Sequence, residues 1–179
     1  MSQTAKAYAQ GLYALAVEED LSSLLLEQLQ AVSDIFSQEP EYMALLSSAS
    51  LTKEERTESL NACFQERVHP YLLNFLKILT EKGYIRHFPQ CCKDYQALYN
   101  SDNGILPVKA VTAAPMPAQQ QEKLREKLES VTGKKVQLTC RVDASCLGGI
   151  RLDFDGKRLD GTVAGRLASL AALLKNTAL

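Results

Sequence analysis

Tryptophan is absent from this 179-residue sequence, only 7% of the residues are aromatic, and there are 6 prolines. No apolar run approaches the roughly 20 residues that a helix needs to cross a bilayer, so no membrane span is expected. The N-terminal residues contain neither the apolar core of a signal peptide nor an Arg-rich transit segment. We therefore expect a globular protein that stays in the compartment where it is made.

Histidine is also scarce, and the cysteines do not form a recognisable framework. The two histidines, His69 and His87, lie 18 positions apart, and there is no C-x-x-C motif, so no metal site and no metal cofactor are expected. An odd number of cysteines in a chain without an export signal argues against a disulfide framework. The cysteines are Cys63, Cys91, Cys92, Cys140 and Cys146.

The net charge of −1 hides an uneven distribution along the chain. Residues 1–105 carry 8 Lys+Arg against 14 Asp+Glu, a net charge of −6, and residues 106–179 carry 12 against 7, a net charge of +5. The division indicates either two modules that meet different partners or two ordinarily solvated surfaces.

The first hundred residues have the apolar spacing of amphipathic helices. Thr52 and Glu55 form a capping box, Pro40 and Pro70 suit first helical turns, and Asp20 is placed to cap the second helix. Short loops between helices favour an all-α, six-helix antiparallel bundle. The expected helices are 5–16, 21–36, 40–46, 52–64, 70–82, where Gly83 ends the fifth, and 88–99.

The pattern changes after Gly104, where a small α+β module is expected. Strands are predicted at 105–111, 136–142 and 149–154, and Asp155-Gly156 has the composition of a two-residue hairpin turn. Pro107 cannot donate to a ladder, which predicts an edge strand or a strand start. A helix with Leu124, Leu128 and Val131 on one face and a last helix over 163–174 complete the module.

Catalytic machinery is not evident in the sequence. The Gly-Lys segments lack the pattern of a phosphate-binding loop, and Cys146 has no histidine placed by sequence to activate it. The basic module has one aromatic residue, Phe154, which does not favour nucleic-acid binding. No catalytic residue and no cofactor are therefore predicted. A cytosolic thiol-based redox protein built on Cys91-Cys92 stays as the alternative function.

The first helix places small residues beside aromatic ones, in Tyr8-Ala9 and Tyr13-Ala14-Leu15-Ala16. This composition allows another helix to approach closely, while ordinary packing inside the bundle explains it equally well.

Ordered motifs across the chain resemble one family. Ala7-Tyr8-Ala9 with Leu12 to Ala16 is similar to the opening "YA-x-A-L-[FY]-x-x-A" signature of the δ subunit of F-type ATP synthases, which corresponds to the mitochondrial oligomycin-sensitivity-conferring protein. Further matches are Asn74 to Leu79 with Lys82-Gly83-Tyr84, Thr112 to Pro115, Val142-Asp143, Leu147 to Ile150, and Leu159 to Leu167. Met116 and Thr162 stand where Leu and Ser are common, and Gly11 where the family often has a side chain.

The resemblance implies a non-catalytic stator subunit, peripheral on the cytoplasmic face of the bacterial inner membrane. Residues 1–105 would form the six-helix bundle that binds the N-terminal helix of the α subunit, and residues 106–179 would bind the C-terminal helices of the b stalk. The subunit would hold the catalytic head against rotary torque during proton-driven ATP synthesis. The partner-binding residues expected on the first and fifth helices are Tyr8, Ala9, Leu12, Tyr13, Ala16, Leu76 and Leu79.

The C-terminal motif residues are expected to be structural and not catalytic. The strand that returns from the hairpin must enter the last helix, for which Asp160 or Thr162 would accept from free helix amides and Gly161 would adopt an unusual φ. Gly148 and Gly149 belong to the same predicted structural turn.

Overall fold

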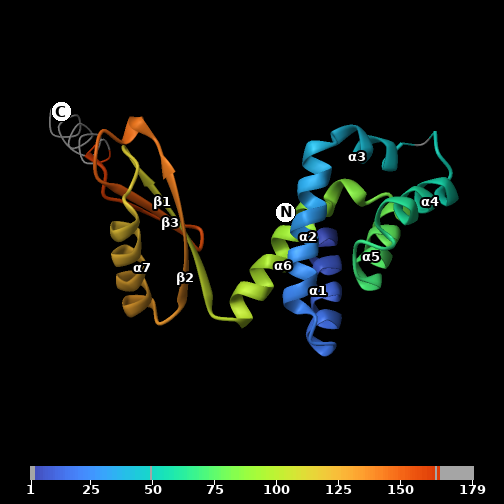
Figure 1. Ribbon diagram of the computed structural model, residues 1–179, viewed down its shortest axis with the longest axis horizontal. Helices are drawn as coiled ribbons and strands as arrows, with labels where there is room; N and C mark the ends of the chain where they lie inside the picture. The colour runs from blue at the N-terminus through green and yellow to red at the C-terminus, as the bar shows by residue number, and fades with distance from the viewer. Residues whose placement is uncertain (1–2, 49, 164, 166–179) are drawn as a thin grey trace, which may run out of the picture. The chain divides into compact units, whose positions relative to one another are not determined.

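The computed structural model describes residues 3–48, 50–163 and 165 (Figure 1). The described residues form seven α-helices and one four-stranded sheet. The chain divides into two compact units, Met1–Tyr99 and Asn100–Leu179, which we call the N-terminal unit and the C-terminal unit. A mostly helical N-terminal part followed by an α/β C-terminal part is therefore confirmed. No helix of the described residues has the length and apolar composition needed to cross a membrane.

Local sequence signals explain where the helices of the N-terminal unit begin and end. Thr52 and Glu55 form the predicted capping box, with the Glu55 amide 3.2 Å from the Thr52 hydroxyl. Pro40 and Pro70 lie in first turns, and Gly83 ends its helix at φ +73°. The helices are α1 (Gln3–Glu18), α2 (Ser22–Gln38), α3 (Pro40–Leu46), α4 (Lys53–Phe64), α5 (Pro70–Glu81) and α6 (Phe88–Asp102).

Asp20 does not cap α2 as predicted. Its φ of +56° places it in the left-handed region, and the position before α2 is Leu21, which makes no side-chain cap. The Leu21 amide instead donates to the Ala16 carbonyl at 2.7 Å, so the end of α1 is closed by backbone bonds.

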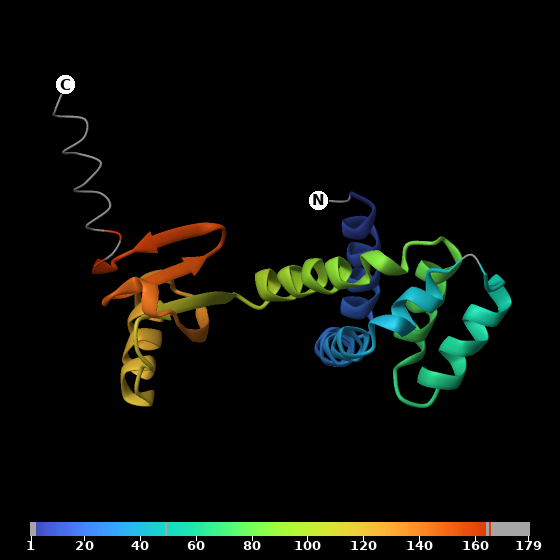
Figure 2. The ribbon, with the colours of Figure 1, turned by 90° about the horizontal axis from the view of Figure 1, so that it is seen from above.

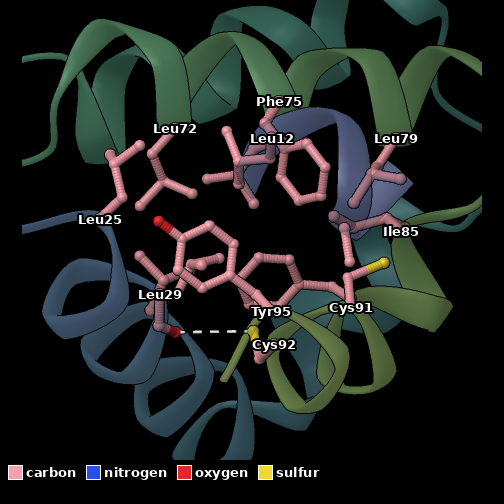
Figure 3. Close-up of a cluster of buried hydrophobic side chains, with 14 of the residues drawn as sticks. Leu12, Leu25, Leu29, Leu72, Phe75, Leu79, Ile85, Cys91, Cys92 and Tyr95 are labelled. Carbon is pink, nitrogen blue, oxygen red and sulfur yellow. Dashed lines mark hydrogen bonds between the residues drawn. The ribbon is translucent and has the colours of Figure 1, made fainter. Parts of the chain in front are cut away.

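The core of the N-terminal unit takes side chains from all six helices, and Figure 3 shows a part of it. Tyr95 of α6 is completely buried, its ring meets Tyr13 edge-on at 5.1 Å, and its hydroxyl donates to the Ser22 carbonyl at 3.0 Å. Leu72 and Leu79 of α5 are equally buried on the facing side. This core is continuous across helices that are far apart in sequence.

The C-terminal unit is a sheet of order β2-β1-β3-β4 with a helix on one face (Figures 1 and 2). The elements are β1 (Ile105–Thr112), α7 (Ala118–Thr132), β2 (Lys135–Val142), β3 (Ile150–Phe154) and β4 (Lys157–Asp160). β1 and β2 are parallel and joined through α7, whereas β1–β3 and β3–β4 are antiparallel. Asp155 and Gly156, at φ +48° and +69°, make the predicted hairpin turn.

Two expectations for this unit differ from the structure. Pro107 lies near the start of β1, as one alternative held, but β1 is an interior strand and not an edge; its pairing with β3 begins only at Val108. On the predicted apolar face of α7, Leu124 and Leu128 are only half-buried and Val131 is 78% exposed, so this helix covers less apolar surface than its sequence pattern predicts. Most of the last predicted helix, 163–174, lies outside the described residues.

Candidate functional site

A hollow of about 380 Å³ lies on the surface of the N-terminal unit between α1 and α5. Each helix contributes side chains at the spacing of one helical face: Tyr8, Leu12 and Leu15 from α1, and Tyr71, Phe75 and Ile78 from α5. We call this hollow the α1–α5 groove. Its lining is completed by Thr4, Ala7, Gly11 and Asn74.

The groove has a buried floor and open walls. Leu12 and Phe75 are each 6% exposed, whereas Ile78 is 36% exposed, and Gly11 also faces outward. Water therefore reaches apolar side chains that two neighbouring helices hold in place. Such a surface is suited to an apolar helix face, because the area it would bury is already arranged on rigid elements.

The two ends of the groove differ in charge and chemistry. Glu19, which follows α1, raises the pKa of Tyr71 through its negative charge, and Glu18 adds to this effect, so both carboxylates lie near the Tyr71 end. At the other end Tyr8 contacts the ring of Tyr84 at 6.0 Å. The acidic end would favour a basic side chain on a bound partner.

Only two of the seven predicted partner-binding residues, Tyr8 and Leu12, line this groove. The other five do not line the groove and are packed in the core, each at most 7% exposed. In particular, Ala9 is 1% exposed and is not among the residues that line the groove. The five core residues are Ala9, Tyr13, Ala16, Leu76 and Leu79.

The helical period explains which predicted residues line the groove. α1 carries two apolar stripes: Ala9, Tyr13 and Ala16 face the core, while Tyr8 and Leu15 lie on the neighbouring stripe that borders the groove. The prediction from sequence took residues from both stripes and did not include Leu15, Tyr71 or Ile78. The sequence does contain a signal for the groove residues, because apolar side chains recur at i, i+4 and i+7 starting from Tyr8 and again from Tyr71.

Side-chain hydrogen bonds hold the predicted turn before the last helix. Asp160 Oδ1 accepts from the Thr162 amide at 2.9 Å and from its hydroxyl at 2.6 Å, and both bonds lower the pKa of Asp160. The Thr162 hydroxyl in turn accepts from the Gly165 amide at 3.0 Å. Thr162 thus makes the side-chain bond typical of a helix N-cap.

The glycines of this region act through close backbone packing. A Cβ on Gly149, at φ +79°, would lie 2.5 Å from the Gly161 carbonyl oxygen, and Gly148 has φ +154°. An unusual φ was expected of Gly161, but its φ is not in the positive region that favours glycine. Its role is the close approach, because a Cβ there would lie 3.1 Å from the Ile150 carbonyl oxygen.

The adjacent cysteines Cys91 and Cys92 are buried in the N-terminal core. The Cys91 thiol donates to the Ala5 carbonyl, and the Cys92 thiol donates to the Leu29 carbonyl, as drawn in Figure 3. Burial raises the pKa of Cys91 to about 11 and that of Cys92 to about 12. Reactive cysteines need an exposed thiol with a lowered pKa. Both thiols therefore have the environment of structural cysteines, which does not favour the redox alternative.

Among the described residues no group of histidine, cysteine or carboxylate side chains is arranged to hold a metal ion. The family model "ATP synthase delta (OSCP) subunit" matches residues 4–174. The chain belongs to this family. The ATP synthase delta family consists of structural, non-catalytic subunits of a membrane-associated complex.

Individual members of the delta family match over nearly their whole length. The ATP synthase subunit delta of Alkaliphilus oremlandii is 32% identical over 165 residues, which cover 92% of each chain. The sodium ion specific delta subunit of Ilyobacter tartaricus is 29% identical over 170 residues, 95% of this chain and 97% of its own. A chain of the Toxoplasma gondii mitochondrial ATP synthase shares the fold, with a TM-score of 0.75 at 21% identity over 95% of this chain and 96% of its own.

Proposed function

We propose that this delta-family chain is a stator subunit that links the catalytic head of an F-type ATP synthase to its peripheral stalk. The six helices α1–α6 act as one bundle that binds the N-terminal helix of the α subunit. The C-terminal unit binds the C-terminal helices of the b subunit. The subunit transmits the resisting torque during proton-driven ATP synthesis and works at the cytoplasmic face of the membrane.

The observation that carries this proposal is the α1–α5 groove. The N-terminal unit closes its own core around Tyr95 and Leu79, yet it leaves Tyr8, Leu15 and Ile78 accessible between two helices. An amphipathic helix would cover these side chains with its apolar face. A basic side chain on that helix would meet Glu18 and Glu19 at one end.

A matched pair of isoleucines tests the groove. Ile78 is 36% exposed and lines it, whereas Ile35 on α2 is 41% exposed and does not. Ile78→Asp should weaken binding of a synthetic α-subunit N-terminal peptide in calorimetry by at least about tenfold, because it places a charge against apolar surface. Ile35→Asp should leave the affinity unchanged. The proposed binding site would be contradicted if both substitutions lowered the peptide affinity equally, or if neither changed it.

For the b subunit, the apolar surface at the end of the sheet supports the proposal. Leu147 is 68% exposed and Val142 49%, beside a hollow lined by residues that include Pro115, Leu124 and Ile150. Leu147→Asp should reduce co-purification of the b subunit but leave α-peptide binding intact. Loss of α-peptide binding with retained b would reverse the assignment of the two units.

A further inference from the structure

Gly11 lies in the middle of α1, a helix of 16 residues from Gln3 to Glu18. Glycine inside a helix is unfavourable compared with alanine, because glycine loses more backbone conformational freedom than alanine when the chain folds. A glycine at this position therefore needs a reason that outweighs its effect on the helix.

The interior of the N-terminal unit does not supply that reason. Gly11 is exposed, and a Cβ built on it would find no atom within 4 Å. Its φ is not in the positive region that favours glycine. Gly149 shows the contrast, since a Cβ there would lie 2.5 Å from a backbone oxygen. The described residues around Gly11 would accept alanine without a clash.

The missing side chain instead opens the α1–α5 groove. Gly11 is one of its lining residues, with Tyr8 three positions before it and Leu15 four positions after it on the same helical face. These two larger side chains flank the glycine along α1, and Ile78 lines the groove from α5. The glycine is therefore a notch between larger residues, with room for the side chain of a partner.

We propose that Gly11 is a specificity-determining residue, whose notch receives one large apolar side chain of the helix bound in the α1–α5 groove. The inference rests on the proposed function, with the α-subunit N-terminal helix as the occupant. The groove requires an apolar face on that helix, and Glu18 and Glu19 favour a basic residue near its Tyr71 end. The notch adds the requirement that one position of the bound helix carries a large side chain.

Two substitutions in the full-length chain test the notch, with Gln10→Ala as the matched control. Gln10 is the exposed neighbour of Gly11 and does not line the groove. Gly11→Ala and Gly11→Leu should both raise the melting temperature of the N-terminal unit by a few degrees, because both residues favour the helix. Both should weaken binding of the α-subunit N-terminal peptide, and Gly11→Leu by about tenfold or more. Gln10→Ala should not change the affinity.

The peptide can be varied to locate the side chain that enters the notch. Each large apolar residue of the peptide is replaced in turn by alanine, and the affinity is measured against the wild type and Gly11→Leu. One truncated peptide should bind both proteins equally, because its side chain no longer competes with the leucine.

The outcomes separate the notch from the groove. If the wild type and the Gly11 variants bind the peptide equally, the notch is refuted while the groove stands. If the wild type does not bind the peptide, the proposed function and the notch both fail. A stabilised Gly11→Leu variant that has lost affinity would support the notch, since unfolding cannot then explain the loss.

Discussion

Ile78 and Leu79 are neighbours in sequence, but the structure assigns them different tasks. Ile78 is 36% exposed in the groove, whereas Leu79 is completely buried among the core residues of the N-terminal unit. Leu79→Ala should therefore destabilise the fold, and Ile78→Ala should mainly weaken binding of the α-subunit peptide. The pair tests directly whether the groove and the core are separated as described.

The expected loss of unfolding free energy in Leu79→Ala follows from the burial of its side chain. Removing a fully buried leucine side chain to alanine typically costs about 2–5 kcal/mol, because transfer free energy is lost and a cavity remains. With a urea dependence of about 2 kcal/mol per molar, a loss of about 3 kcal/mol lowers the unfolding midpoint by about 1.5 M. Ile78→Ala removes less buried area, so its midpoint should move less.

Tyrosine fluorescence can follow the N-terminal unit alone in the full-length chain. All 7 tyrosines precede residue 100, and the chain has no tryptophan. Urea unfolding would be compared with peptide calorimetry for the two variants and the wild type. A Leu79→Ala variant with an unchanged midpoint, or an Ile78→Ala variant as destabilised as Leu79→Ala, would show that the division between core and groove is misplaced.

Three further predictions concern other parts of the chain. Gly149→Ala should destabilise the C-terminal unit, seen as faster hydrogen exchange, whereas Gly156→Ala should perturb it less, because both glycines have positive φ but only Gly149 faces a backbone oxygen at 2.5 Å. Cys91 and Cys92 should resist alkylation at neutral pH until the protein unfolds, and rapid modification detected by mass spectrometry would contradict their raised pKa values. The pKa of Asp160 is lowered in the folded state, so its contribution to the free energy of unfolding is present above the unfolded pKa of about 3.9 and is lost as the pH falls through the folded pKa. Asp160→Asn should therefore make stability depend less on pH in the acid range. An unchanged pH dependence would count against the bonds between Asp160 and Thr162.

Ordered motifs in the sequence are enough to indicate the delta family, and the family match over residues 4–174 agrees with them. The sequence predicts the residues of the proposed groove less completely than it predicts the family. Partner binding was predicted on α1 and α5, the two helices that do border a groove, but five of the seven residues chosen do not line it, including the buried Tyr13 and Leu76. Conversely, Gly11 was regarded only as a departure from the family pattern.

Features that depend on a few neighbouring residues were determined by the sequence itself. The capping box of Thr52 and Glu55, the helix start at Pro70 and the hairpin turn at Asp155 each form through bonds or dihedral preferences within about four residues. Such interactions are encoded locally, and packing elsewhere did not alter them.

Tertiary structure decided which side of each element faces the core. Tyr8 and Tyr13 both lie on apolar stripes of α1, and only the positions of α5 and α6 make one a groove residue and the other a core residue in contact with Tyr95. Pro107 became part of an interior strand because β3 pairs with β1 just beyond it. Apolar periodicity specifies that a face will be covered, but the covering element comes from residues far away in the chain, which no local pattern identifies.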